Sequence, residues 1–367
     1  MRLLITTDTV GGVWTFTSEL SEELLRRGHD VALVSFGGSP SAAQTAWAER
    51  QTSAFSDHFS YTPSDTPLEW MQENTRALPE GEAVLHRVAE HFQPDLLVSN
   101  QFCFGAITAR LPRVVIGHSD VLSWAKAAKP SALEPSPWLN QYTSLVQMGL
   151  MQADALLAPT SSVLRDLKVN FFLPASGTVI PNGRRLPPAA SRSERRLQAV
   201  TAGRLWDEAK GLDLLRATEL PLPVLLAGDL APRGDEATHA SAAHLQVLGP
   251  LEPEALYNVF RESAIYLCTS LYEPFGLAPL EAGLCGCAVV ARDLPSLREV
   301  WGDSALYFTT AEQLQGQLRM LVHVPEALAE AQVRSRRRAA LFTVERMTDA
   351  YLSAFDAVVR RKALHVA

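Results

Sequence analysis

The feature that most constrains this fold is an alternation of short apolar runs with helix-like segments, which occurs twice along the 367-residue chain. Each apolar run has the length of a strand that is buried on both faces of a parallel sheet. The segments between the runs have the apolar spacing of helices. The chain is therefore predicted to form two similar α/β domains in tandem.

The first series of elements starts close to the amino terminus. A strand is predicted at residues 3–7, a turn at 8–12, a helix at 13–27 and a second strand at 31–36. From residue 37 to 92 the chain is polar, and helices at 68–78 and 83–92 are favoured over strands. Further strands are predicted at 96–99, 114–117, 155–158 and 179–180.

A polar, proline-bearing stretch at residues 183–196 predicts a linker. It divides the chain into a first domain at 1–183 and a second at 184–343. In the second domain, strands are predicted at 197–202, 224–227, 245–248, 265–269 and 288–291. Helices are predicted at 212–218, 254–261, 277–284, 296–301, 311–322 and 325–341, and a final amphipathic helix at 344–361.

Composition excludes several classes of protein. With 47% hydrophobic and 20% charged residues, the chain is neither disordered nor collagen-like. Its net charge of −7 disfavours nucleic acid as a partner. Four cysteines are too few for a disulfide framework, and they are expected to be reduced. The apolar start stops at Asp8, too early for a signal peptide, and no run could span a bilayer, so a cytoplasmic protein without indicated membrane association is expected.

The segment from Ser270 to Gly283 carries the most chemical information. Glu273 stands in the loop after a predicted strand, a helix starts near Gly276, and Glu281 lies inside that helix. The free amides of the helix start form an anion site between two acids that can each accept hydroxyl hydrogen bonds. This pattern suits a phosphate-linked sugar. Taken singly, however, Glu273 could cap the helix and Glu281 could lie on a solvated face.

A second segment supports this interpretation. Gly203 and Arg204 follow a predicted strand, and Lys210 opens the next helix. Two cations at the same edge could hold a diphosphate and stabilise it as it leaves. Taken alone, Arg204 and Lys210 are better explained as solvated surface charges.

Together these motifs resemble the donor domain of the retaining glycosyltransferases of family 4. The matching residues are Gly203-Arg204-Leu205, Lys210-Gly211 and the stretch from Glu273-Pro-Phe-Gly-Leu to Leu280-Glu281-Ala282. The resemblance covers most of the chain, including Gly11-Gly12, Pro181-Asn182-Gly183 and residues 294–300. It implies the GT-B fold, with two Rossmann-like domains facing a central cleft and a helix at 344–367 that crosses back to the first domain.

The resemblance also implies roles for individual residues. Its catalytic set comprises Glu273 and His118 at the transferred sugar, and Arg204 and Lys210 at the diphosphate. Glu281 would hold the ribose diol. The full donor-binding set is Gly11, Gly12, Gly203, Arg204, Lys210, Phe275, Gly276, Leu277 and Glu281. Two departures stand out: Arg184-Arg185 follow Gly183, and residues 295–298 are not the small residues usual before Glu299.

The implied reaction is transfer of a hexose from a UDP-, GDP- or ADP-sugar to a hydroxyl, with retention by front-face attack. It needs no metal or other cofactor. The acceptor is open: a sugar, a lipid-linked molecule or another small molecule. A catalytically silent sugar-nucleotide-binding protein remains an alternative, as do a nucleotide-sugar epimerase and a phosphorylase on the same fold. A dinucleotide oxidoreductase is disfavoured, because residues 10–14 lack the Gly-x-Gly-x-x-Gly spacing.

Overall fold

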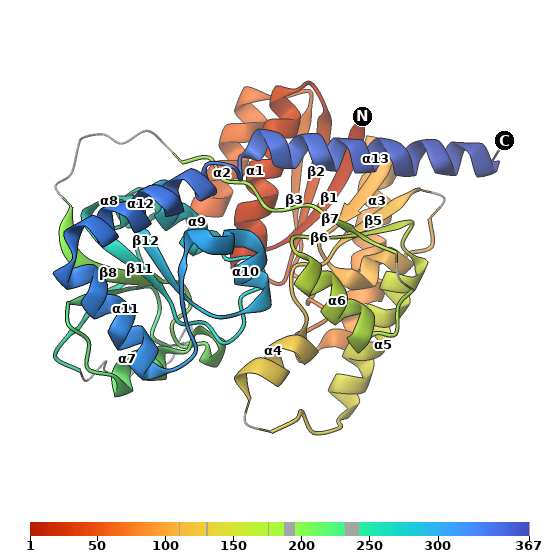
Figure 1. Cartoon of the computed structure of the whole chain (residues 1–367). Helices are drawn as coiled ribbons and strands as arrows, with labels where there is room; N and C mark the ends of the chain where they lie inside the picture. Colours follow the sequence, from red (N-terminus) through yellow and green to blue (C-terminus); the bar gives the residue numbers. More distant parts are fainter. Residues whose placement is uncertain (110, 130, 175, 187–194, 232–241, 367) are drawn as a thin grey trace. The chain divides into compact units, whose positions relative to one another are not determined.

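The computed structural model describes residues 1–367 except for 110, 130, 175, 187–194, 232–241 and 367 (Figure 1). The chain forms two compact units. The first comprises Met1–Leu122, Leu133–Gly183 and Val344–Ala367, and the second Ser123–Ala132 and Arg184–Thr343. The middle of the predicted linker, residues 187–194, lies outside the described residues.

In the first unit, seven strands of the described chain form one parallel sheet in the order β3-β2-β1-β4-β5-β6-β7. The strands are β1 (Arg2–Asp8), β2 (Asp30–Phe36), β3 (Phe59–Pro63), β4 (Leu96–Ser99), β5 (Arg113–Ile116), β6 (Ala155–Ala158) and β7 (Thr178–Val179). The helices are α1 (Gly12–Arg26), α2 (Ala42–Ala54), α3 (Ala77–Phe92), α5 (Pro137–Gln152), α6 (Ser161–Asn170) and α13 (Val344–Val366). A further helix, α4 (Val121–Ala128), starts in this unit and continues into the segment grouped with the second.

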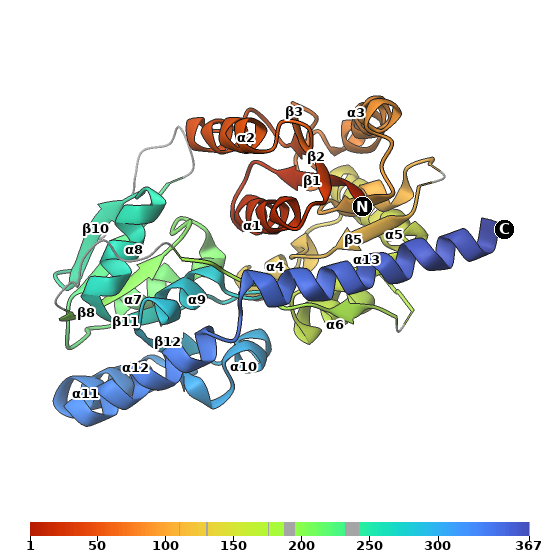
Figure 2. The same ribbon diagram turned by 90° about the horizontal axis from the view of Figure 1, so that it is seen from above.

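Alternate residues of β1 enter different layers of the first unit. Leu3 and Ile5 pack in a core with buried residues of α1 and α13, including Tyr351. Leu4 packs on the other side with residues of α3 and α5. The sheet is therefore covered on both faces, as its continuous apolar strands require. The carboxy-terminal helix α13 lies along the first sheet (Figures 1 and 2), as the family resemblance implied.

The second unit repeats this architecture. Its sheet, counted over the described residues, has six parallel strands in the order β10-β9-β8-β11-β12-β13. The strands are β8 (Arg196–Ala202), β9 (Val224–Ala227), β10 (Leu245–Gly249), β11 (Ser263–Cys268), β12 (Ala288–Arg292) and β13 (Leu306–Phe308). The helices are α7 (Leu212–Ala217), α8 (Pro253–Glu262), α9 (Leu277–Leu284), α10 (Pro295–Trp301), α11 (Ala311–His323) and α12 (Pro325–Ala339).

Both sheets reverse their strand order at one point. In the first sheet the reversal falls between β1 and β4, and in the second between β8 and β11. Parallel α/β sheets bind ligands at the carboxyl ends of the strands beside such a switch point. The loops after β1, β4, β8 and β11 are thus the places where a site is expected.

Most predicted elements are confirmed. The prediction missed helices α4, α5 and α6 and strand β13, and it was wrong in part of the region from 37 to 92. Strand β3 and helix α2 occupy residues where no element was predicted. Within the predicted helix at 68–78, residues 74–76 form a 3₁₀ turn, and only residues 77–78 belong to a helix, α3. β3 is an edge strand with half-exposed residues, so its sequence lacks the apolar run on which strand prediction depended. Among the described helices, none is long and apolar enough to cross a membrane.

Candidate functional site

The predicted donor residues of the second unit lie at its switch point. Gly203 and Arg204 directly follow β8, and residues 269–276 form the loop between β11 and α9. The two loops are joined through their backbones, since the amide of Leu271 donates to the carbonyl of Ala209 at 2.7 Å. Segments far apart in the sequence therefore meet at one edge of the sheet.

Lys210 and Glu273 form a direct ion pair at this edge. Lys210 Nζ lies 2.7 Å from Glu273 Oε2, and the two side chains are 23% and 13% exposed. The hydroxyl of Ser270 donates to the same carboxylate oxygen at 3.1 Å. Burial by itself would lower the pKa of the Lys210 ammonium, but the Glu273 carboxylate outweighs it and the pKa lies above its ordinary value. Lys210 is thus held as a cation.

Arg204 has a more open position. Its side chain is 45% exposed, and Nη2 lies 3.5 Å from Asp207 Oδ2. The guanidinium also lies 5.8 Å from the ring centroid of Trp206. Its positive charge opposes the rise in the pKa of Lys210, so the two cations lie within electrostatic reach of each other. An anion arriving at this edge would meet both.

The amino terminus of α9 follows Glu273 by a few residues. Gly276 precedes the helix with φ of 91°, where a Cβ atom would come within 2.7 Å of Pro279 Cγ. Phe275 is buried, and no side chain among the described residues caps the first amides, which start at Leu277. The alternative in which Glu273 caps this helix is therefore wrong. The uncapped helix start is a favourable place for a phosphate.

Glu281 is held by a partner that the sequence analysis did not identify. Its carboxylate Oε1 lies 2.8 Å from Arg184 Nε, and the two side chains are only 10% and 7% exposed. Arg184 also donates from Nη2 to the hydroxyl of Tyr257 at 2.5 Å. Burial raises the pKa of Glu281, and Arg184 acts in the opposite direction. The alternative in which Glu281 lies on a solvated face is wrong.

Both acids act electrostatically on one buried tyrosine, Tyr266, which precedes them in the sequence. Tyr266 of β11 is 2% exposed, and its hydroxyl donates to the carbonyl of Ala202 at 3.4 Å. Burial raises the pKa of Tyr266 well above its ordinary value, and both Glu273 and Glu281 add to the rise. The structure therefore brings the donor residues of the second unit to one region. Lys210 and Glu273 are in contact there, and Glu281 pairs with Arg184.

Gly11, Gly12 and His118 belong to the first unit. Gly11, in the turn after β1, and Gly12, the first residue of α1, are exposed, and no side chain in the described part of the chain caps α1. His118 follows β5, and its Nε2 lies 2.6 Å from Asn100 Oδ1. Its ring packs against Phe16 with centroids 4.8 Å apart, and burial lowers the pKa of His118 to about 4. The imidazole is therefore neutral near pH 7.

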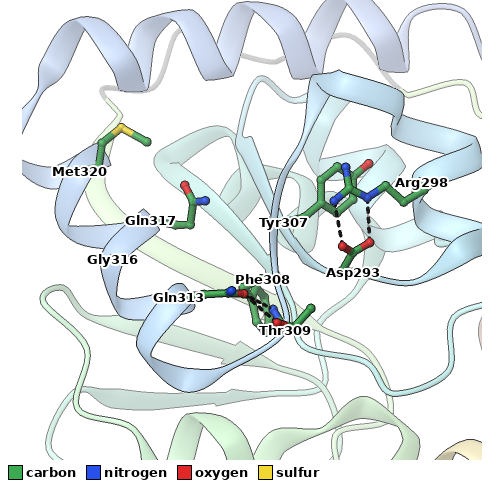
Figure 3. Close-up of a pocket in the computed structure, with 9 residues that line it drawn as sticks. All are labelled: Asp293, Arg298, Tyr307, Phe308, Thr309, Gln313, Gly316, Gln317 and Met320. Atoms are coloured by element: carbon green, nitrogen blue, oxygen red, sulfur yellow. Dashed lines mark hydrogen bonds and ion pairs between the residues drawn. The ribbon is translucent and has the colours of Figure 1, made fainter.

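A separate cavity of about 500 Å³ lies on the second unit near β13 and α11 (Figure 3). In the figure, Arg298 and Asp293 face each other, and their atoms form two hydrogen bonds of 2.7 and 2.8 Å. The Arg298 guanidinium also lies 3.7 Å from the ring centroid of Tyr307. No predicted site residue lines this cavity. Asp293 and Arg298 are paired with each other there, and this cavity lies outside the predicted donor site.

Comparison with known proteins covers both units. The family model described as Glycosyltransferase Family 4 matches residues 10–186, and the one described as Glycosyl transferases group 1 matches residues 195–338. The chain belongs to the group 1 glycosyltransferases of the GT-B fold.

Individual relatives of this glycosyltransferase are distant. It is 29% identical over 175 residues to D-inositol 3-phosphate glycosyltransferase of Rhodococcus erythropolis (44% of this chain and 39% of that protein). It is 27% identical over 258 residues to alpha-maltose-1-phosphate synthase of Mycobacterium tuberculosis (61% of this chain and 65% of that protein). The match thus spans less than two thirds of either relative. Sucrose-phosphate synthase from Thermosynechococcus elongatus shares the fold, with a TM-score of 0.78 at 18% identity over 97% of this chain and 100% of that chain.

Several residues around the predicted site were missed by sequence reasoning. Asp207 accepts a hydrogen bond from Trp124 Nε1 at 3.0 Å and one from the amide of Ala209 at 3.0 Å, which shapes the loop that carries Lys210. Arg184 was noted only as a departure from the family pattern. That departure, directly after Pro181-Asn182-Gly183, was the one available signal.

Proposed function

We propose that this glycosyltransferase moves a sugar from a nucleoside-diphosphate sugar to a hydroxyl of an acceptor, with retention of anomeric configuration. The observation that carries the proposal is the contact between Lys210 and Glu273 beside the uncapped start of α9. A cation and free amides suit a diphosphate, and a carboxylate at the same place suits the hydroxyls of a sugar. Few other ligands present both kinds of group together.

In this proposal, different residues of the second unit bind different parts of the donor. The diphosphate would be bound by the side chains of Lys210 and Arg204. It would also accept hydrogen bonds from backbone amides at Gly203 and near Phe275, Gly276 and Leu277. Negative charge grows on the leaving group as the glycosidic bond breaks, and fixed positive charges are most effective there. Glu273 would accept hydrogen bonds from the transferred sugar, and Glu281 would hold the ribose diol.

Retention is proposed to occur by front-face attack assisted by the leaving phosphate. A double displacement needs a carboxylate free to bond with the anomeric carbon. Glu273 instead accepts contacts from Lys210 and Ser270, which suits binding better than nucleophilic attack. Two cations and a helix dipole could neutralise the diphosphate without a metal, so we propose metal-independent transfer.

The relatives' names add one class of candidate acceptor. D-inositol 3-phosphate glycosyltransferase and alpha-maltose-1-phosphate synthase are both named for phosphorylated polyols or sugars. Sugar phosphates therefore join unmodified sugars and lipid-linked acceptors in an acceptor screen.

The thiols of Cys103, Cys268, Cys285 and Cys287 are free, which supports the expected cytoplasmic location.

The test has two stages. Thermal-shift titration with UDP, GDP and ADP would identify the nucleotide, and its sugars would then be incubated with candidate acceptors in EDTA and in Mg²⁺. Two results together would support the proposal: release of nucleoside diphosphate, and an NMR spectrum showing that an α-linked donor gives an α-linked product. Saturable nucleotide binding without release would instead indicate a catalytically silent binding protein. An inverted product would contradict the proposed mechanism.

A further inference from the structure

Asn100 lies at the switch point of the first sheet and contacts both β1 and α1. It directly follows β4, and the residue is 8% exposed. Its side-chain nitrogen Nδ2 donates to the carbonyl of Thr6 at 2.6 Å and to Thr17 Oγ1 at 3.1 Å. Its backbone amide donates to Thr6 Oγ1 at 3.0 Å. The side chain is therefore held from two elements.

These contacts determine the orientation of the Asn100 side-chain amide, that is, the positions of its Oδ1 and Nδ2 atoms. The Thr6 carbonyl can only accept a hydrogen bond. The Thr17 hydroxyl has a single hydrogen, which it donates to the carbonyl of Val13 at 2.8 Å. Thr17 Oγ1 must then act as an acceptor towards Asn100. Both hydrogens of Nδ2 are thus committed, and a flipped amide would set oxygen against two acceptors.

The orientation of Asn100 determines the tautomer of His118. Asn100 Oδ1 can only accept, and it lies 2.6 Å from His118 Nε2. His118 Nε2 must therefore carry a hydrogen. Burial is the cause of the low pKa of His118, and no charged side chain in the described ranges adds to it, so the ring holds this one hydrogen at neutral pH. Nδ1 is left with a lone pair, and it has no partner among the described residues.

We propose that Asn100 is a positioning residue that fixes His118 as the Nε2–H tautomer, so that His118 Nδ1 accepts a hydrogen bond from a substrate hydroxyl. The hydroxyl partner rests on the proposed function, whereas the tautomer rests on the contacts of Asn100 alone. A bare lone pair repels an anion, so this nitrogen selects an alcohol and not a phosphate or a carboxylate. The edge-on contact of Phe16 with the ring restricts its plane.

The tautomer of His118 can be measured in the free protein, without any substrate. In protein labelled with ¹⁵N at histidine, long-range ¹H–¹⁵N correlation separates a protonated from an unprotonated ring nitrogen, and His118→Gln identifies the His118 signals. The expected spectrum has a protonated Nε2, a bare Nδ1 and no titration between pH 8 and 5. A protonated Nδ1, rapid averaging between tautomers, or titration near pH 6.5 in the wild-type protein overturns the proposal.

Variants of Asn100 extend the test. In Asn100→Asp the carboxylate would stabilise the imidazolium, so the His118 ring should titrate at a higher pH than in the wild type. Asn100→Ala should allow both tautomers and lower turnover about fivefold to tenfold, the effect of one lost hydrogen bond. Ser18→Ala, which removes only a hydroxyl bonded to Thr15 within α1, should leave the ring spectrum unchanged. An unaltered spectrum in both Asn100 variants would remove Asn100 from this role.

Substrate addition separates the two parts of the proposal. UDP-glucose, GDP-mannose and ADP-glucose would be added in turn, with the matching nucleoside diphosphates as controls. A sugar hydroxyl on Nδ1 should shift its resonance with the nucleotide sugar or the acceptor and not with the nucleoside diphosphate alone. If no nucleotide sugar binds, the proposed function and the hydroxyl partner both fall, while the free-protein spectrum still decides the role of Asn100.

Discussion

Lys210 Nζ lies 2.7 Å from Glu273 Oε2, so the cation assigned to the leaving diphosphate and the acid assigned to the transferred sugar form one ion pair. The pair is partly buried, and Ser270 supports the same carboxylate oxygen. Both side chains are thus held in place before any donor binds. Charges that are already oriented stabilise a transition state with little reorganisation.

Replacing Lys210 by Met should lower kcat by about 10²–10³-fold, the usual effect of losing one group that stabilises transition-state charge. Nucleoside diphosphate release under saturating donor is the measurement. Arg334→Ala is a matched control, because Arg334 forms an exposed pair with Glu330 on α12 and should change stability by less than about 0.5 kcal/mol. Near-normal turnover in the Lys210 variant would exclude this residue from the site.

Glu281 should prove important for both stability and nucleotide binding. Glu281→Ala leaves Arg184 buried without its carboxylate, which should cost about 3–5 kcal/mol of unfolding free energy. The double variant Arg184→Met with Glu281→Leu should recover most of that loss, because a buried pair replaced by apolar side chains is close to neutral. Urea unfolding measures this recovery.

The same double variant isolates the nucleotide-binding role of Glu281. It should stay folded yet bind nucleotide weakly, since the acceptor of the ribose diol is gone. Titration calorimetry with the nucleotide found in the thermal-shift screen is the measurement. Wild-type affinity in the stable double variant would reduce Glu281 to a purely structural residue.

Gly228 packs closely against Gly203, which precedes Arg204, so substitution of Gly228 tests the packing of the loop that carries Arg204. Gly228 has φ of 135°, and a Cβ atom there would come within 1.9 Å of the carbonyl oxygen of Gly203. Gly228→Ala should therefore cost about 2–4 kcal/mol and displace the loop, which weakens nucleotide binding. The Gly228 amide donates to Gly249, where a Cβ atom meets nothing within 4 Å at φ of 72°. Gly249→Ala should cost only about 1 kcal/mol and leave binding intact.

His118 should make the stability of the protein depend on pH. Its pKa is about 4 in the folded protein against an ordinary value of 6.5, so the unfolded chain binds a proton more readily between these values. The free energy of unfolding should fall as the pH drops through this window, by up to about 3 kcal/mol from this residue. Comparing denaturant unfolding of wild type and His118→Gln at pH 7 and pH 4.5 measures the contribution. Equal pH dependence in the two proteins would contradict it.

Several features could be predicted from the sequence because their causes are local. The central strands are continuous apolar runs, so β4, β6 and β9 were located with their bounds. The edge strand β3 was missed because its half-exposed residues do not form an apolar run. The edge strand β13 was missed because it has only three residues. The spacing of Glu273, Gly276 and Glu281 also indicated two acids around a helix start without any knowledge of their neighbours.

The sequence by itself determined the repeated α/β architecture, the family, and which residue types stand at the carboxyl ends of the strands. Only the tertiary structure decided which groups those residues contact: Glu273 meets Lys210, Glu281 meets Arg184, and His118 meets Asn100. Parallel strands joined by helices bring together loops that are distant in the chain. A side chain's ionisation and hydrogen-bonding role depend on those neighbours, so they are set by the fold and not by the local sequence.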